Sequence, residues 1–341
     1  MPLGRTLRNV PRTSCEPYRT QEIRPMTVEH LQELHGLPTF VFPSKGESTE
    51  LPAAEVVAWS IAASPYSDET EEFTEVFERF LSTVDVAKVR ALIIGQWGEP
   101  YDNSSDDVVE LLVAAKDRLT SLEALFIGDL EAEEAEISWI EQGDVTPVLA
   151  AYPRLRELGV RGGTGLRFPA VRHEALRTLT FEAGGLPGEV VRGVVASDLP
   201  ALEYLEMWLG VEEYGGDATV ADLTPLLDGG RFPRLRHLGL RNSEIQDEIA
   251  TAVAAAPVVA QLASLDLSLG VLSDAGALAL LDGQPLTHLK WIDLHHNFVT
   301  EDVANRLRAA WEPAGVEVDL SETGDSWEDG DEIHRYTAVA E

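Results

Sequence analysis

The sequence contains one cysteine, Cys15, in 341 residues. A disulfide framework and a cysteine-rich zinc site are therefore excluded, and this usage is typical of a reducing cytoplasm. Long hydrophobic runs are also missing, because the longest apolar stretch, residues 250–265, is rich in small residues and is broken by Pro257. A membrane-spanning helix needs about 20 predominantly apolar residues, so the sequence predicts none.

Basic residues are scarce, with 26 Lys and Arg against 59 Asp and Glu, which gives a formal net charge of −33. Such a chain repels phosphate backbones and anionic lipid surfaces, so we expect neither nucleic acid nor membrane as a partner. Two interpretations of the charge remain open. It favours solubility alone, or it favours a protein partner with a basic segment.

The sequence also lacks the common catalytic motifs. The glycine-rich stretch "RGGTG" (161–165) has no following Lys-Ser/Thr and so is not a phosphate-binding loop, and no G-x-S-x-G is present. Acidic residues occur throughout and indicate no particular acid–base pair. We therefore predict a protein that is not an enzyme, with no catalytic residue and no cofactor.

Residues 1–25 differ from the rest of the chain. They carry five Arg and two acidic residues, and they lack the apolar segment of a secretory signal. A second possible start, Met26, opens a stretch of different composition. We expect 1–25 to be a disordered extension or an over-long start, with a short basic tail as the alternative.

A leucine-rich pattern repeats along the chain. In "LKWIDLHHNFV" (289–299), apolar residues stand at positions 1, 4, 6 and 11 and Asn297 at position 9, which matches the leucine-rich-repeat pattern. The same 1-4-6 spacing starts at eight places, which are Val89, Leu122, Leu155, Leu176, Leu202, Leu235, Leu262 and Leu289. A partial copy follows at Val318 and Leu320. Eight matches predict stacked coils that share one core.

Helix-like stretches separate the predicted strands, for example 104–119, 244–256 and 299–311. We therefore predict an α/β fold: a leucine-rich-repeat solenoid that forms an open horseshoe, with parallel strands on the concave side and helices on the convex side. The 27-residue spacing near the C-terminus resembles ribonuclease-inhibitor-like repeats. Asparagine at position 9 occurs only at Asn297, so we expect irregular loops.

The sequence predicts four segments. Residues 1–25 are the extension, 26–85 an α+β N-terminal cap, 86–321 the solenoid, and 322–341 an acidic loop with a C-terminal capping strand. A cap is expected because a solenoid exposes its core at an uncovered end.

Three stretches, "ELHGLPTFVFP" (33–43), "FERFLSTVDVAKVRALIIGQWGE" (77–99) and "RYTAVAE" (335–341), resemble a functionally uncharacterised bacterial family of leucine-rich-repeat proteins. Genes of that family lie near genes for radical-SAM and hydrolase-type enzymes. The resemblance therefore implies an accessory role beside such enzymes, and it transfers no catalytic residue.

Side chains alternate along a strand, so positions 3, 5 and 7 of each repeat should face the concave solvent side. This face is predicted to be acidic and to carry large aromatic residues, which often anchor protein interfaces. A loop that covers the tryptophans is the alternative. The predicted partner-binding residues are Tyr204, Glu206, Trp208, His237, Arg241, Asp266, Trp291, Asp293, His295 and Asp319.

Asp266, Asp293 and Asp319 occupy position 5 in consecutive units. At a strand spacing of about 4.8 Å their charges should repel and raise the carboxyl pKa values, which a basic group of a partner would relieve. Screening by water and salt is the alternative. The adjacent His295 and His296 point apart on a strand, and Asp293 with His295 gives only two ligands, so no metal site is predicted.

The resulting hypothesis is a cytoplasmic, non-enzymatic scaffold that binds a protein partner on its concave face. The alternative is a metal-dependent enzyme, or enzyme subunit, with a site at the rim near Asp293 and His295.

Overall fold

The computed structural model describes residues 28–63, 71–324, 326–329 and 332–340. The predictions for residues 1–25 and for a start at Met26 lie outside these ranges. No helix among the described residues is long and apolar enough to cross a membrane.

One sheet of twelve strands runs from β1 to β12 in the order of the sequence. All neighbouring strands are parallel except β1 and β2, which are antiparallel. The strands are β1 (Glu33–Leu34), β2 (Leu37–Val41), β3 (Ala58–Ala63), β4 (Ala91–Trp97), β5 (Ala124–Ile127), β6 (Glu157–Arg161), β7 (Thr178–Glu182), β8 (Tyr204–Gly210), β9 (His237–Ser243), β10 (Ser264–Asp266), β11 (Trp291–Asp293) and β12 (Glu317–Asp319).

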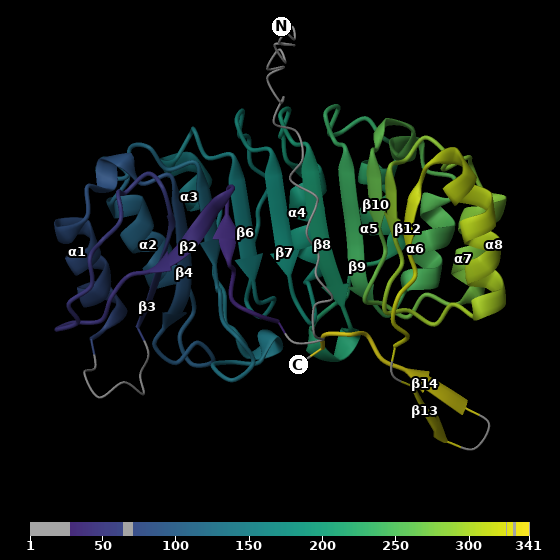
Figure 1. The fold of residues 1–341 in the computed structure, drawn as a ribbon, viewed down its shortest axis with the longest axis horizontal. Helices are drawn as coiled ribbons and strands as arrows, with labels where there is room; N and C mark the ends of the chain where they lie inside the picture. Colours follow the sequence, from purple (N-terminus) through teal and green to yellow (C-terminus); the bar gives the residue numbers. More distant parts are fainter. Residues whose placement is uncertain (1–27, 64–70, 325, 330–331, 341) are drawn as a thin grey trace, which may run out of the picture.

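Helices lie behind this sheet along its length, so that sheet and helices form two curved layers (Figure 1). They are α1 (Phe73–Thr83), α2 (Asp106–Ala114), α3 (Pro147–Ala151), α4 (Gly188–Ala196), α5 (Val220–Leu227), α6 (Gln246–Val253), α7 (Asp274–Asp282) and α8 (Glu301–Trp311). The long parallel sheet with helices on one side fits the predicted α/β solenoid.

The core lies between the two layers. Positions 1, 4 and 6 of the repeats are buried there, as in the unit of Leu262, Leu265 and Leu267, where the last two have no exposed surface. Each apolar side chain of this size contributes about 1.5–3 kcal/mol when it is fully buried. Asn297 at position 9 supports the adjacent turn: its side chain accepts from Leu272 N and donates to Leu267 O. The prediction that these positions face inward is confirmed.

Residues 26–85, expected as an N-terminal cap, supply β1, β2, β3 and α1. The strands β2 and β3 continue the parallel sheet, with Thr39 opposite Ala58 and Ala58 opposite Ala91. Phe77 and Phe80 of α1 are buried in the same core as the repeats. The segment is therefore continuous with the solenoid through both its sheet and its core.

Residues 28–37, the N-terminal cover, fold over the sheet face opposite the helices, which we call the concave face. Figure 1 shows this purple segment across the face of the sheet. Leu34 packs against Ala91, Ile93 and Phe126, all nearly or fully buried. These three residues occupy positions 3 and 5 of their repeats, so the expectation that they face solvent is wrong. The physical reason is that the cover supplies apolar side chains to an apolar stretch of the face.

Residues 322–341, expected as an acidic loop and a capping edge strand, are arranged differently. Among the described residues, Ser326–Asp329 (β13) and Glu332–Arg335 (β14) pair with each other and with no other strand, in an antiparallel arrangement that projects from the body (Figure 1). The prediction of a last strand on the sheet edge is therefore wrong. The chain after the hairpin returns to the middle of the sheet.

Residues 336–340, the C-terminal strap, lie against the end of β8 and β9. The side chain of Asn242 accepts a hydrogen bond from Val339 N at 3.0 Å and donates to Val339 O. Ala338 N donates to Leu269 O at 2.8 Å. Val339 packs on Trp208, which is only 7% exposed. Trp208 is therefore not a solvent-exposed anchor, and the alternative of a covered tryptophan holds for it.

We expect the N-terminal cover to loosen as the pH rises from below 6.5, the usual pKa of histidine, through the raised folded-state pKa of His30. The hydrogen bond to Asp129 is the main reason that the pKa of His30 lies above its usual 6.5; burial opposes it, and the charges of Asp129, Glu134 and Glu131 add to it. A group whose pKa is raised by folding stabilises the folded state at pH values below its unfolded-state pKa. This stabilisation is lost as the pH rises through the folded-state pKa.

Hydrogen exchange of the Leu31 amide, which donates to Asp129 Oδ1 at 3.0 Å, measures the effect. After correction for intrinsic exchange, protection should fall with pH in the wild type and stay level in His30→Gln. A wild-type protection factor that does not change with pH would contradict this.

The substitution Asn242→Gly should release the strap. Asn242 has φ of +52°, which glycine tolerates, so the change removes the side-chain hydrogen bonds without straining the backbone. Each bond contributes about 1 kcal/mol, so exchange of the Val339 amide should accelerate roughly tenfold or more.

The matched control is Asn305→Gly, at an exposed position of α8, which should lower the free energy of unfolding without affecting the strap selectively. Unchanged protection of Val339 in Asn242→Gly would show that this side chain does not hold the strap.

Candidate functional site

The predicted partner-binding residues gather on the concave face of β8 to β12 and the turn after β11. We call nine of them the concave cluster, leaving out the covered Trp208: Tyr204, Glu206, His237, Arg241, Asp266, Trp291, Asp293, His295 and Asp319. The structure brings all nine together because successive coils stack in strict register. The N-terminal cover packs mainly over β3, β4 and β5, and its first residue, Val28, packs in the cluster around Trp208.

The register explains the row of aspartates. Asp266 is directly opposite Asp293 across β10 and β11, and Asp293 is directly opposite Asp319 across β11 and β12. Side chains at paired positions of a sheet lie on the same face. The predicted row of three carboxylates is therefore present.

Three rings form a second row, at position 3. The rings of Tyr204 and His237 are stacked with centroids 4.0 Å apart, and His237 lies 6.2 Å from Trp291. Ser264 occupies the strand between His237 and Trp291, and its hydroxyl is 2.8 Å from His237 Nδ1. This small residue leaves room for the two rings to approach. Burial lowers the pKa of His237 to about 4, so this ring is neutral at pH 7.

Arg241 connects the buried acidic groups. Its Nη1 donates to Glu206 Oε1 at 2.6 Å, and its Nε lies 3.3 Å from Asp266 Oδ2. The guanidinium also lies over the ring of Trp208, 5.2 Å from the centroid. Trp208 Nε1 and the Tyr204 hydroxyl donate to Glu206 as well. Glu206 is thus fully engaged within the protein.

The two carboxyl groups beside Arg241 titrate in opposite directions. Burial alone would raise the pKa of Glu206, but the charge of Arg241 and the hydrogen bonds from Tyr204 and Trp208 outweigh it and lower the pKa to about 2. For Asp266, burial dominates, and the charges of Asp293 and Glu206 add to it, so the pKa rises to about 7 despite Arg241. The predicted upward shift therefore occurs at Asp266, with burial rather than repulsion as its largest cause.

The exposure of the cluster differs from the expectation. Glu206, His237, Arg241, Asp266 and Asp293 are buried, so they do not face bulk solvent as positions 3, 5 and 7 were predicted to do. The accessible members are partly exposed, and these are Tyr204, Trp291, His295 and Asp319. Glu317, which the sequence placed on this face at position 3 of the last unit, is exposed beside them. Contact with a partner would therefore centre on β11 and β12.

The quoted histidines have separate environments. His295 Nδ1 lies 2.7 Å from Asp293 Oδ1. Burial is the largest single effect on the pKa of His295 and would lower it, but the hydrogen bond and the charge of Asp293 together outweigh burial and raise this pKa. His296 is buried, with φ of +52°, at the turn. The expectation that the pair does not converge on one ion fits this geometry.

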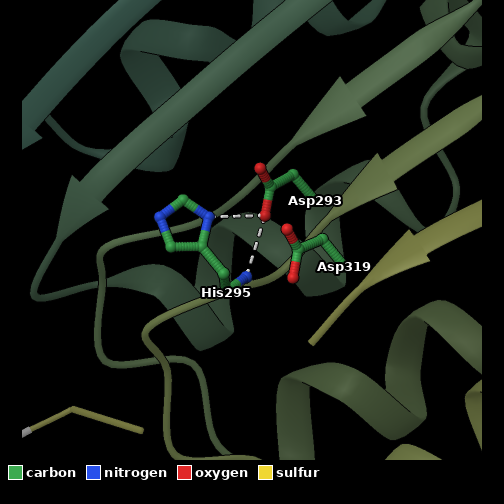
Figure 2. Close-up of side chains that lie close together, drawn as sticks. All are labelled: Asp293, His295 and Asp319. Carbon is green, nitrogen blue, oxygen red and sulfur yellow. Dashed lines mark hydrogen bonds and ion pairs between the residues drawn. The ribbon is translucent and has the colours of Figure 1, made fainter. Parts of the chain in front are cut away.

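A third donor joins Asp293 and His295, and sequence reasoning did not assign it. One ligand atom from each of Asp293, His295 and Asp319 lies within 4.8 Å of the others, and Figure 2 shows the three side chains close together. The signal was available, because Asp319 shares position 5 with Asp293 in the next unit. The sequence analysis treated Asp319 as a member of the carboxylate row and not as a ligand beside His295.

The sequence matches no protein-family model and no curated protein. Its structure is similar to the crystal structure of a protein from Bacteroides fragilis, with 32% sequence identity and a TM-score of 0.71, over 82% of this chain and 77% of that chain. An internalin from Listeria monocytogenes aligns over 77% of this chain and 87% of its own, at 12% identity and a TM-score of 0.26, too low to support an argument. Because identity of 32% extends over most of both chains, this chain belongs to the same family as the Bacteroides fragilis protein.

Proposed function

We propose that this protein is a non-enzymatic scaffold that binds a basic segment of a protein partner at the C-terminal end of its concave face. The observation that carries the proposal is the row of Asp266, Asp293 and Asp319 across three adjacent strands. The nine-residue cluster has four acidic members and one arginine, and Arg241 is engaged with Glu206 and Asp266. The accessible end of the row therefore has an excess of negative charge.

The partly exposed aromatic residues also favour the binding of a basic segment. Trp291 and Tyr204 are partly exposed on either side of the buried His237 ring. An aromatic ring next to carboxylates suits an Arg or Lys side chain, whose stem packs on the ring while its charge meets the acid. Contact at Trp291, Asp319 and Glu317 would use both interactions. Trp208 takes no part in this contact, because the strap covers it.

The proposal also includes the class of partner, the repeat type and the accessory role that the sequence predicts. The partner is a cytoplasmic protein, and neither nucleic acid nor a membrane, as the net charge of −33 favours. The coils are of the ribonuclease-inhibitor-like type, as the 27-residue spacing indicates. An accessory role beside radical-SAM or hydrolase-type enzymes is the context that the family resemblance suggests.

The second candidate is a metal-dependent enzyme or enzyme subunit with a rim site at Asp293 and His295. The three-donor group with Asp319 is the observation in its favour. Turnover would need a substrate site beside the ion, and the partly exposed Trp291 would then line it. The first candidate explains the aromatic row and the charge together, so we prefer it.

Replacing Trp291 or Asp319 should weaken partner capture from the native host by tenfold or more, because a central aromatic or charged anchor contributes about 2 kcal/mol. The experiment is quantitative affinity purification with mass spectrometry, using Trp291→Ala and Asp319→Asn. Trp139→Ala is the matched control, since Trp139 is 57% exposed and lies in a short helical turn outside β8 to β12.

The electrostatic attraction between the acidic row and the partner is tested by the salt dependence of partner affinity. Partner affinity should fall as salt is raised, and the salt dependence should be smaller for Asp319→Asn than for the wild type. Equal capture by the wild type and both site variants would reject this face as the binding surface. Binding that is insensitive to salt would reject the electrostatic part.

A further inference from the structure

The side chains of Asp293, His295 and Asp319 come from β11, the turn after it, and β12. The pairing of Asp293 with Asp319 across the two strands fixes the carboxylates side by side, and His295 follows Asp293 by two residues on the same face. Three oxygen and nitrogen donors thus converge from backbone positions that the solenoid core holds in place.

Asp293 has one oxygen that the described protein leaves unsatisfied. Oδ1 accepts hydrogen bonds from the backbone N and the ring of His295, at 2.9 and 2.7 Å. Oδ2 is buried and has no hydrogen-bond partner, and the residue as a whole has no exposed surface. A buried acceptor without a donor destabilises the folded protein, and more so when it is charged. A cation at this point would remove that destabilisation.

The other two donors are already oriented. Asp319 Oδ1 accepts from the backbone N and the hydroxyl of Ser321, at 2.9 and 2.6 Å, which fixes the carboxylate and leaves its second oxygen outside these bonds. The ring of His295 lies with Nδ1 2.7 Å from Asp293 Oδ1, a hydrogen bond in which Nδ1 donates, so an ion bound to Nδ1 would replace that proton. Both residues are partly exposed, so an ion could reach them from solvent.

The local charge favours a cation despite the nearby guanidinium. Arg241 is offset by Glu206 and Asp266, both in ion-pair contact with it. Asp293 and Asp319 then add two negative charges that Arg241 does not neutralise.

We propose that Asp293, His295 and Asp319 form a binding site for one divalent transition-metal ion, such as Zn²⁺ or Mn²⁺, with water in the remaining positions. Imidazole together with carboxylate suits these ions better than Ca²⁺ or Mg²⁺, which take oxygen ligands. Metal–donor bonds of about 2.0–2.2 Å place donors of one ion within about 4.4 Å of each other. The observed separation of at most 4.8 Å needs only small side-chain rotations to meet this.

This site does not depend on the proposed scaffold function. A metal ion and a basic side chain of the partner would compete for Asp293 and Asp319, so added metal would lower partner affinity. Partner capture in the presence of a chelator tests the scaffold alone, and metal binding without any partner tests the site alone.

The test uses the full chain without a polyhistidine tag, stripped with a chelator and then titrated with ZnCl₂ or MnCl₂ by calorimetry. Metal content after gel filtration gives the stoichiometry. We expect one ion per chain. His295→Gln and Asp319→Asn should each weaken binding at least tenfold, since each removes one of three protein ligands.

Glu317→Gln is the matched control, because it removes one negative charge from β12 but none of the three donors, and it should change affinity less than threefold. Thermal unfolding of each apo variant checks that the fold is retained. For the wild type, Co²⁺ substitution should also give a visible absorption band that His295→Gln alters. Failure of the stripped wild type to bind Zn²⁺ or Mn²⁺ at one ion per chain would overturn the proposal. So would equal affinity in His295→Gln, Asp319→Asn and Glu317→Gln, which would place the ion elsewhere.

Discussion

Burial of three apolar side chains per repeat in one continuous core is the constraint on which the rest of the structure depends. Leu265 and Ile292 are fully buried and directly opposite each other on β10 and β11, so the two strands cannot shift by one residue without exposing these apolar side chains. The register that protects the core also fixes the opposite face. Asp266 must then lie beside Asp293, whatever the electrostatic cost.

The electrostatic repulsion in this row of acidic residues is offset by other groups of the protein around Glu206 and Asp266. It is not offset in the same way at Asp319. Around Glu206 and Asp266, Arg241 supplies the charge, Trp208 donates a hydrogen bond to Glu206, and Ser268 donates to Asp266. Among the described residues, the Asp319 carboxylate accepts hydrogen bonds from Ser321, and Asp319 is partly exposed. Buried acidic groups with arginine are weak evidence of stability, because their desolvation offsets their attraction. The Asp319 end of the row is where an external cation would gain most, and both proposals use it.

The sequence predicted the repeating part of the fold because its signal is local and periodic. Every 1-4-6 position from Val89 to Leu294 is buried, and the helical stretch at 299–311 contains α8. The cover and the strap were not predictable in this way. Leu31 bonds to Asp129, 98 residues away, and Val339 to Asn242, 97 residues away, and neither contact belongs to a repeat.

The sequence predicted which residues share the concave face, but it did not predict how far each of them is exposed to solvent. Alternation along the strands correctly placed Glu206, Asp266 and Asp293 on one face, since alternation depends only on backbone geometry. Whether that face is covered depends on segments distant in sequence, such as the strap over Trp208. Asp319 as a third donor follows from stacking of neighbouring coils, which becomes visible only when repeats are compared with one another.

The central claim is that the core register places two carboxylates side by side so that their charges repel, and a double-mutant cycle on Asp293 and Asp319 tests it directly. Urea unfolding in the presence of a chelator would compare Asp293→Asn, Asp319→Asn and the double variant with the wild type. Repulsion is removed by either change alone, so the double variant should be less stable than the sum of the two single effects by a few tenths to about 1 kcal/mol. Effects that add within error would show that the two carboxylates do not repel, and would contradict this account.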